Sequence, residues 1–207
     1  MRANRDTRER TFTENARRAQ IVRAAIETIG ELGYARMSFG QVAKRAGLSS
    51  TGMISYHFDG KADLVAEVTR HVLDESVRYM GPRVEAAEGY AAKLRAYIES
   101  NLEFIQQHPA ELRAILDILH NSRAGHPDAV GNDAWYAEAV NILEGLLADG
   151  QRAGEFGDFD PRVLAIVVRQ GIDGFFPELE AHPDTDAVRY AQGLVQIIEK
   201  VTGGTTK

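Results

Sequence analysis

Apolar residues recur at the spacing of an α-helix along most of this 207-residue chain, and this periodicity limits the fold more than any other feature. The first apolar stripe consists of Ile21, Val22, Ala25, Ile26 and Ile29. Further stripes of the same kind occupy residues 90–105, 112–119, 135–146 and 188–201. No stretch alternates like a strand over a useful length. The sequence therefore predicts an all-α protein with about nine helices.

The first three expected helices have clear start and stop signals. Two capping boxes, a Ser or Thr followed three residues later by Glu or Gln, stand at Thr11 and Ser38. Gly33 and Gly47 are expected to end the two helices that begin there. A turn of about four residues and a short helix over 50–57 follow.

Proline and aspartate mark the expected bounds downstream. A long helix begins near Gly60, and Gly81-Pro82 is expected to break or kink it. Asp160-Pro161 has the pattern of an N-cap followed by the first helical residue, and that helix is expected to continue to about Glu180. The last helix is expected to begin at Asp184 or Thr185.

Charge is divided unevenly along the chain. Residues 1–60 carry ten Lys and Arg against six Asp and Glu, a net of +4, and residues 61–207 carry fourteen against twenty-four, a net of −10. Chance clustering is one explanation, but a basic segment on an acidic body favours phosphate contact by the N-terminal part alone. We therefore expect a DNA-binding domain over 1–60 and a second helical domain over 61–207.

Composition narrows the class of protein further. The chain has no cysteine, which rules out a disulfide framework and a thiolate metal site. It has no apolar run long enough to span a bilayer, and its charged N-terminus lacks the apolar core of a secretory signal. We expect a cytoplasmic protein with no membrane partner.

The stretch "AGLSSTGMISYHFDGKADL", residues 46–64, carries the clearest functional signal. It joins two short helices through a glycine-containing turn, and the second helix is rich in hydroxyl and aromatic groups. That layout is typical of a helix-turn-helix, whose second helix enters the major groove of DNA. Hydroxyls at the start of that helix can contact phosphates and base edges.

On these residues the chain resembles the TetR family of bacterial transcriptional regulators. The resemblance covers residues 14–64 and rests on "RRAQIVRAAIETIGELGYARMSF", on "QVAKRAGLS" and above all on "YHFDGKADL". It implies that Tyr56 and His57 lie at the backbone-contacting end of the recognition helix and that Lys61 contacts phosphate. It also implies that Phe58 belongs to the core and that Leu64 anchors the fourth helix.

The predicted DNA-binding residues combine this resemblance with the local pattern. The span from Gly47 to Phe58 is one residue longer than in the commonest family pattern, which leaves the register of the base-facing residues open, with Thr51, Met53 and Ser55 as candidates. The full predicted set is Arg17, Lys44, Arg45, Ser49, Ser50, Thr51, Met53, Ser55, Tyr56, His57 and Lys61. An arginine-rich arm, with Arg2, Arg5, Arg8 and Arg10, either enters a minor groove or is a solvated tail.

The rest of the chain has features of a sensor and dimer module. The segment "VLAIVVRQGIDGFF" is apolar on more than one side, and Gly171 and Gly174 permit close helix approach. We expect a homodimer through the last two helices, bound to a palindromic DNA operator. A small-molecule effector is expected to contact Tyr97, Asn101, Phe104, Arg113, Asp117, His120, Trp135, Tyr136 and Phe175. An Arg113–Asp117 surface pair and a core role for Trp135 are the plainer alternatives.

Other classes of function fit less well. The chain lacks a nucleophile elbow, a phosphate-binding loop and a His-Glu-x-x-His motif, so no enzyme activity is expected. Its six histidines are dispersed, and neither a metal site nor a cofactor is predicted. A repressor released by a small molecule is the preferred function. A regulator whose body binds a protein partner or no ligand, and an activator, are the alternatives.

Overall fold

The computed structural model describes residues 12–123 and 132–203, which form α-helices and one 3-10 turn and contain no strand. The all-α prediction is therefore confirmed. The elements are α1 (Phe12–Leu32), η1 (Tyr34–Arg36), α2 (Phe39–Arg45), α3 (Gly52–His57), α4 (Lys61–Glu85), α5 (Tyr90–Gln107), α6 (Pro109–Arg123), α7 (Asn132–Arg152), α8 (Pro161–Asp173), α9 (Phe175–Ala181) and α10 (Ala187–Thr202). None of these helices is both long and apolar enough to cross a membrane.

The described chain divides into two compact units. The N-terminal unit contains residues 12–71 and 113–123, and the C-terminal unit contains residues 72–112 and 132–203. This division differs from the predicted one at residue 60, because the first part of α4 and most of α6 belong to the N-terminal unit. Both helices therefore continue from one unit into the other.

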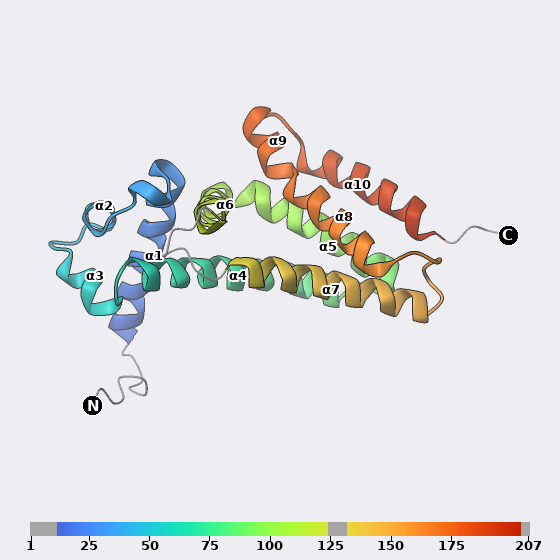
Figure 1. Cartoon of the computed structure of the whole chain (residues 1–207), viewed down its shortest axis with the longest axis horizontal. Helices are drawn as coiled ribbons and strands as arrows, with labels where there is room; N and C mark the ends of the chain where they lie inside the picture. The colour runs from blue at the N-terminus through green and yellow to red at the C-terminus, as the bar shows by residue number, and fades with distance from the viewer. Residues whose placement is uncertain (1–11, 124–131, 204–207) are drawn as a thin grey trace. The chain divides into compact units, whose positions relative to one another are not determined.

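The N-terminal unit is built on α1, which packs against α2 and η1 (Figure 1). The predicted capping box at Ser38 is present, since the Ser38 side chain accepts from the Gln41 N–H and the Gln41 side chain accepts from the Ser38 N–H. The predicted stop at Gly33 is also present, because α1 ends one residue before it. The core consists of Ile21, Val22, Ala25, Ile26, Ile29, Tyr34, Val42, Ile54, Phe58, Leu64, Val65 and Val68.

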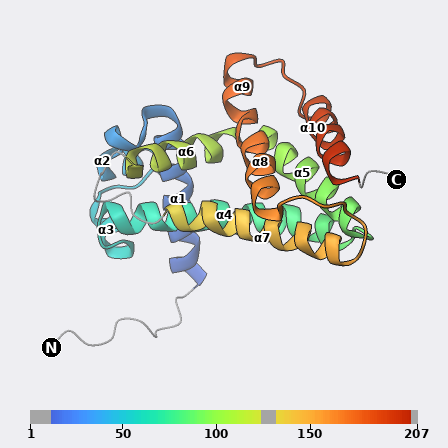
Figure 2. The ribbon, with the colours of Figure 1, turned by 45° about the vertical axis from the view of Figure 1, so that its right-hand side comes forward.

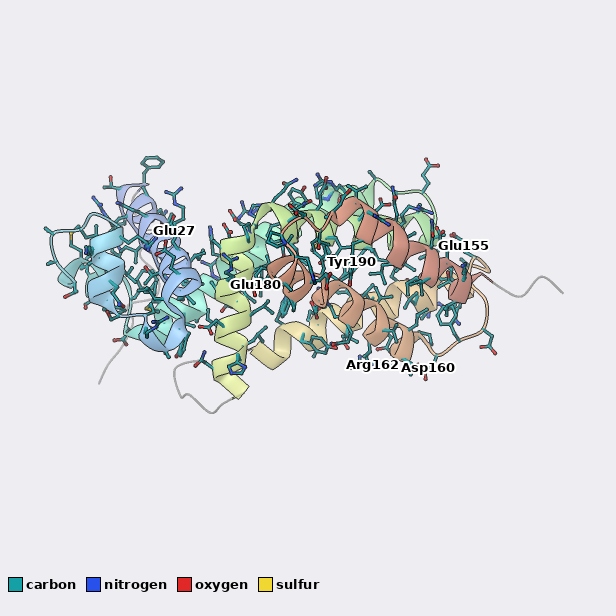
Figure 3. All side chains as sticks on the ribbon, turned by 90° about the horizontal axis from the view of Figure 1, so that it is seen from above. Glu27, Glu155, Asp160, Arg162, Glu180 and Tyr190 are labelled. Atoms are coloured by element: carbon teal, nitrogen blue, oxygen red, sulfur yellow. The ribbon has the colours of Figure 1, made fainter. Side chains whose placement is uncertain are left out.

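In the C-terminal unit, α7 packs on α8, and α5 packs against α7 and α10 (Figure 1). The predicted N-cap at Asp160 is confirmed, because its side chain accepts from the Val163 N–H at 3.0 Å, with Pro161 in the first turn. Asp160 and Arg162 lie together at the start of α8 (Figure 3), where Arg162 pairs with Glu144 on α7 at 2.8 Å. Charged residues at this end therefore tie α8 to α7.

The structure differs from the expected bounds at three places. The helix expected over 160–180 is divided at Gly174 into α8 and α9 (Figure 2), which raises the count to ten α-helices in the described residues. Pro177 has no N–H to donate to the Asp173 carbonyl four residues earlier, so the ladder cannot continue there. Pro82 does not end α4, which continues to Glu85, and α10 is capped by Asp186 rather than Asp184 or Thr185.

Candidate nucleic-acid interface and effector region

The turn between α2 and α3 is closed by backbone bonds and one left-handed residue. Gly47 has a φ of 63°, a conformation in which a side chain is strained, and it follows Ala46, the C-cap of α2. The Leu48 N–H donates to the Ala43 carbonyl at 2.9 Å, which folds the turn back on α2. The local sequence therefore fixes where α3 leaves α2.

Helix α3 is anchored by one face and exposed on the other. Ile54 is fully buried, and Phe58, the C-cap of α3, is only 2% exposed. On the opposite face Thr51 and Ser55 are exposed, and the Tyr56 side chain is 74% exposed. Thr51, Ser55 and Tyr56 therefore face solvent on a helix that is held in place by its buried side.

A shallow groove of about 540 Å³ runs beside this exposed face. Its lining consists of Thr13, Glu14, Arg17, Ser50, Gly52, Met53, Tyr56 and His57. Five of the predicted DNA-binding residues thus lie around one groove between the first turns of α1 and α3. The Tyr56 hydroxyl donates to Glu14 Oε1 at 3.2 Å, and Ser49 Oγ lies 3.7 Å from the sulfur of Met53.

The predicted phosphate-contacting cations have different surroundings. Lys44 is exposed on α2. Arg45 is paired with Glu27 and Glu31 of α1, and hydrogen bonding to Glu31 raises its pKa further. The Lys61 ammonium donates to the Tyr34 carbonyl at 2.7 Å and lies 4.1 Å from the centre of the Tyr34 ring. Arg45 and Lys61 therefore also join helices within the unit.

Sequence reasoning missed Arg18, which holds the end of α3 in place. Its guanidinium donates to the His57 carbonyl and to Glu67 Oε2, both at 2.7 Å, and lies 4.1 Å above the ring of Phe58. The two paired side chains are only 12% and 15% exposed. Burial raises the pKa of the Glu67 carboxyl, but Arg18 and Arg70 lower it by more, so it stays below its usual value.

The nine predicted effector residues fall into two groups. Tyr97, Asn101, Phe104, Trp135, Tyr136 and Phe175 belong to the C-terminal unit, whereas Arg113, Asp117 and His120 belong to the N-terminal unit. Asp117 accepts a hydrogen bond from the Tyr34 N–H at the start of η1. Arg113 and His120 are exposed. The cations of the arm, Arg2 to Arg10, lie outside the described residues.

A buried arginine, Arg169 of α8, contacts Tyr97, Asn101 and Trp135 of the first group and was not predicted. Its Nη1 lies 3.4 Å from the Tyr97 hydroxyl and 3.3 Å from Asn101 Oδ1, and its Nη2 donates to Asp173. The side chain is 5% exposed, and its Nε has no hydrogen-bond partner among the described residues. Burial lowers the pKa of this guanidinium, but Tyr97 and Asp173 raise it by more.

Aromatic residues of α7 complete this polar cluster. The Arg169 guanidinium lies 5.9 Å from the ring of Trp135, and the Tyr136 hydroxyl accepts from Gln170 at 2.8 Å. The structure therefore brings Tyr97, Asn101, Trp135 and Tyr136 to the same part of the molecule. It does not bring Arg113, Asp117 or His120 into the same compact unit.

A separate cavity of about 350 Å³ lies between α5 and the start of α10. Its lining consists of Arg83, Ala96, Glu99, Ser100, Glu103, Ala187, Val188, Ala191 and Gln192. None of the nine predicted effector residues lines it. Its polar side chains alternate with small ones along two helices far apart in sequence, so no local motif indicates it.

Helices α8 and α10 carry most of the exposed apolar surface. Of the ten large hydrophobic side chains that are exposed in the described residues, six lie on these two helices: Val163, Ile166, Val167, Val188, Ile197 and Val201. Gly171 of α8 lets α10 come close, since a Cβ there would lie 2.9 Å from Leu194 Cδ1. The Tyr190 hydroxyl, labelled in Figure 3, donates to the Gly171 carbonyl at 2.9 Å.

Comparison with known proteins places the N-terminal region in a family. Residues 21–68 match the model of bacterial regulatory proteins of the tetR family. Over 124 residues the chain is 31% identical to the HTH-type transcriptional regulator BetI of Cronobacter sakazakii, an alignment that covers 56% of this chain and 60% of BetI. Over 184 residues it is 27% identical to the HTH-type transcriptional regulator RutR of Escherichia coli O157:H7, covering 84% and 82%.

The fold is shared with solved structures as well. The crystal structure of AibR in complex with isovaleryl coenzyme A and operator DNA matches with a TM-score of 0.74 at 18% identity, over 87% of this chain and 97% of AibR. At that identity the match concerns the fold alone. The segment matched by the family model contains α2, α3 and the start of α4, and therefore the exposed face of α3.

Proposed function

Because this chain belongs to the tetR family of bacterial regulatory proteins, we propose that it is a transcriptional regulator that binds duplex DNA through α3. The observation that carries this proposal is the exposed face of α3, which contains Thr51, Ser55 and Tyr56. The buried side chains of Ile54 and Phe58 hold this helix in the core. A helix of this size can present three or four side chains to base edges in the major groove. We propose Arg17 on α1 and Lys44 on α2 as phosphate contacts beside α3. Because the proposed partner is DNA, we also propose that the protein is cytoplasmic.

A salt titration with a labelled random duplex tests the DNA-binding part of the proposal. Neutralised phosphates release counterions, so the logarithm of the binding constant is expected to fall linearly with the logarithm of salt concentration. A linear fall with a slope of several units would support contact by the basic surface of the N-terminal unit. Absence of binding even at low salt would contradict it.

We propose further that the protein is a homodimer through the outer faces of α8 and α10. Six exposed apolar side chains and a groove of about 590 Å³ along α10 support this interface. Exposed apolar side chains gathered on two neighbouring helices are typical of a protein–protein contact. Two recognition helices related by a two-fold axis would then meet a palindromic operator with half-sites about 34 Å apart.

Replacing Ile197 by Asp is expected to convert the dimer to a monomer, because a carboxylate would be buried against apolar side chains of the partner. Ile197 is 60% exposed within one chain, so the substitution leaves the fold of the monomer intact. Val77→Asp, on α4 at a position 64% exposed, is the matched control and is expected to leave the dimer unchanged. Sedimentation velocity distinguishes the two species. A wild-type monomer, or a dimer that survives Ile197→Asp, would argue against this interface.

For the effector we propose a small molecule that places a hydrogen-bond acceptor against the Arg169 cluster. Buried polar groups are normally satisfied, and the unpartnered Nε and the long contacts to Tyr97 and Asn101 leave donor capacity at Arg169. Aromatic walls beside a few converging polar groups are typical of ligand sites. Helices α4 and α6 continue into the N-terminal unit, so they are the elements through which a ligand would alter DNA affinity.

Trp135 provides a direct readout of this site, because it is the only tryptophan of the chain. A compound that raises the melting temperature is expected to change Trp135 fluorescence as well, and to lose affinity in Asn101→Leu. A Trp135→Phe variant shows whether the fluorescence change arises there. A compound that stabilises the protein with unchanged fluorescence would place the effector elsewhere, with the cavity between α5 and α10 as the candidate.

The direction of regulation is proposed to be repression relieved by the effector. A coupling of about 1–3 kcal/mol between effector and operator would change operator occupancy roughly 5- to 150-fold. Release of a bound duplex on adding the stabilising compound supports this, and tighter binding would indicate an activator or a corepressor. If the C-terminal unit instead binds a protein partner, no compound of a metabolite library is expected to stabilise the protein.

A further inference from the structure

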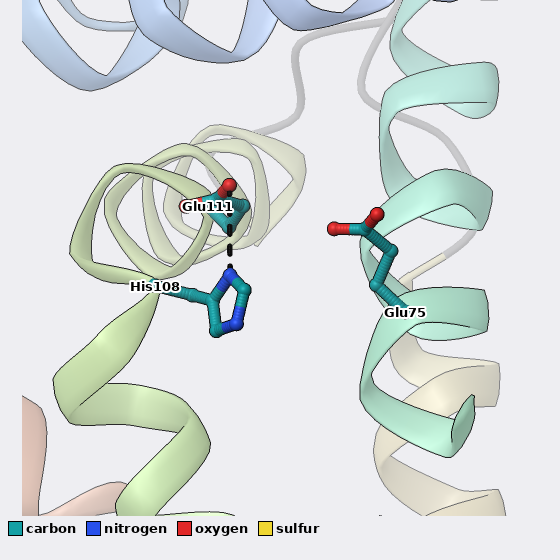
Figure 4. Close-up of side chains that lie close together, drawn as sticks. All are labelled: Glu75, His108 and Glu111. Carbon is teal, nitrogen blue, oxygen red and sulfur yellow. Dashed lines mark ion pairs between the residues drawn. The ribbon is translucent and has the colours of Figure 1, made fainter. Parts of the chain in front are cut away.

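We propose that Glu75, His108 and Glu111 form a binding site for a divalent transition-metal ion such as Zn²⁺. The three residues come from α4, from the junction of α5 with α6, and from the first turn of α6. One ligand atom of each lies within 4.8 Å of the other two (Figure 4). All three belong to the C-terminal unit, and the inference does not depend on DNA binding.

The spacing of the donors suits an ion better than a simple ion pair. His108 Nδ1 lies 3.8 Å from Glu111 Oε1, beyond the range of a hydrogen bond. A tetrahedral Zn²⁺ with bonds of about 2.0–2.2 Å holds its ligands roughly 3.4 Å apart. Small rotations of two glutamate side chains would therefore bring all three donors to bonding distance. Figure 4 shows the Glu75 carboxylate directed from α4 toward the other two residues.

The imidazole is held in place by its neighbours. The His108 ring stacks on Phe104 with centroids 4.3 Å apart, and the Tyr79 ring meets it edge-on at 6.2 Å. The backbone N–H of His108 donates to the Phe104 carbonyl at 2.9 Å, which fixes the main chain at the end of α5. A ligand whose rotamer is fixed by packing loses little freedom when it binds a metal.

Burial and charge are also those of a metal site. The side chains of Glu75, His108 and Glu111 are 30%, 28% and 25% exposed, so each is partly withdrawn from water and yet within reach of an ion. Two carboxylates beside one imidazole give the site a negative charge that a divalent cation would neutralise. The ion pair between Arg78 and Glu75 is long, at 4.0 Å, and Arg78 is 68% exposed, so this pair is weak.

The donor set selects the class of ion. Imidazole with carboxylates suits Zn²⁺ and its first-row neighbours, whereas Mg²⁺ prefers oxygen ligands alone. Three protein ligands leave a fourth position for water or another small ligand.

His182 and Glu178 form a comparison pair on α9 and its C-cap. His182 Nδ1 and Glu178 Oε1 lie 3.0 Å apart, and the two side chains are 68% and 46% exposed. In the described residues this pair belongs to no group of three potential ligands.

Equilibrium dialysis and calorimetry with Zn²⁺ test the proposal on protein freed of any affinity tag. We expect one tightly bound Zn²⁺ per chain and little competition from Mg²⁺. Glu75→Gln and His108→Ala are each expected to weaken Zn²⁺ binding at least tenfold, because even the loss of an outer-shell partner typically costs about 10–100-fold. His182→Ala is expected to change nothing.

Visible absorption of the Co²⁺-loaded protein gives a second readout, since its intensity and position report the coordination of the ion. Circular dichroism must show the same helicity in all variants, and Glu75→Gln, which keeps the size of the side chain, keeps the test valid if His108→Ala unfolds. Binding that survives Glu75→Gln and His108→Ala with unchanged affinity would overturn the site. Absence of stoichiometric Zn²⁺ binding to the wild-type protein would overturn it equally.

Discussion

Replacing Ser55 by Glu is expected to reduce operator affinity at least 100-fold while leaving the fold unchanged. Ser55 lies on the exposed face of α3, and within the described part of the chain its hydroxyl donates to the Thr51 carbonyl of the same helix at 3.4 Å. A carboxylate at this position would face the negative potential of the major groove. Like charges brought together at an interface cost several kcal/mol, and each 1.4 kcal/mol is about a factor of ten in affinity.

Fluorescence anisotropy with a labelled operator duplex measures this loss. Gln106→Glu is the matched control, because it adds the same carboxylate at an exposed position of α5 in the C-terminal unit. We expect the control to bind within about twofold of the wild type. If Ser55→Glu and Gln106→Glu bound equally well, α3 would not be the recognition helix.

Replacing Arg18 by Ala is expected to lower the free energy of unfolding of the N-terminal unit by about 2–3 kcal/mol, because hydrogen bonds to charged groups contribute about 1.5–3 kcal/mol. The substitution leaves the part-buried Glu67 carboxylate with Arg70 as its remaining ion-pair partner among the described residues and removes the bond to the His57 carbonyl. Phe58 loses the guanidinium above its ring. The end of α3 is therefore expected to loosen, and DNA binding to fall with stability.

Denaturant unfolding followed by circular dichroism measures this effect, and Arg17→Ala is the control. Arg17 is the adjacent residue, and its bond to Gln20 at 2.7 Å joins a charged and an uncharged side chain of the same helix, without an ion pair to another helix among the described residues. We expect that control to cost less than about 1 kcal/mol. Equal losses for the two variants would show that Arg18 is no more than a surface residue.

The pH dependence of the Arg18→Ala loss follows from the lowered pKa of Glu67. A carboxyl whose pKa is lower in the folded state contributes stability above its unfolded pKa, near 4.5, and that contribution is lost as pH falls through the folded value. The difference between wild type and Arg18→Ala is therefore expected to be full at pH 7. It should shrink as the solution is made acidic enough to protonate Glu67.

Local signals predicted most of the fold. The capping box at Ser38, the stop at Gly33 and the N-cap at Asp160 each depend on residues within four positions of one another, and all three are present. The break at Gly174 was missed because the apolar stripe continues through it. The break depends on Pro177, which has no N–H and so removes one backbone hydrogen bond from the helix. Periodicity reports which side of a helix is apolar but not where its hydrogen bonds are interrupted.

The candidate sites depend on residues far apart in sequence, and here the sequence was less informative. Arg18 was not among the predicted residues, because its partners His57 and Glu67 are 39 and 49 residues away in the sequence. Arg169 was not predicted because its neighbours in the sequence are apolar, and only the tertiary fold brings Tyr97 and Asn101 to it. By contrast, the exposed face of α3 could be expected from sequence, because its motif is local.

Selection of binding sites from a pool of random duplexes by the purified protein is the decisive measurement for DNA recognition by α3. We predict enrichment of one palindrome, with half-sites about one helical turn apart and with an affinity that falls steeply with salt. The same selection with Ser55→Glu should enrich nothing. Salt-dependent retention of the pool without any enriched sequence, for wild type and variant alike, would contradict sequence-specific regulation by this protein.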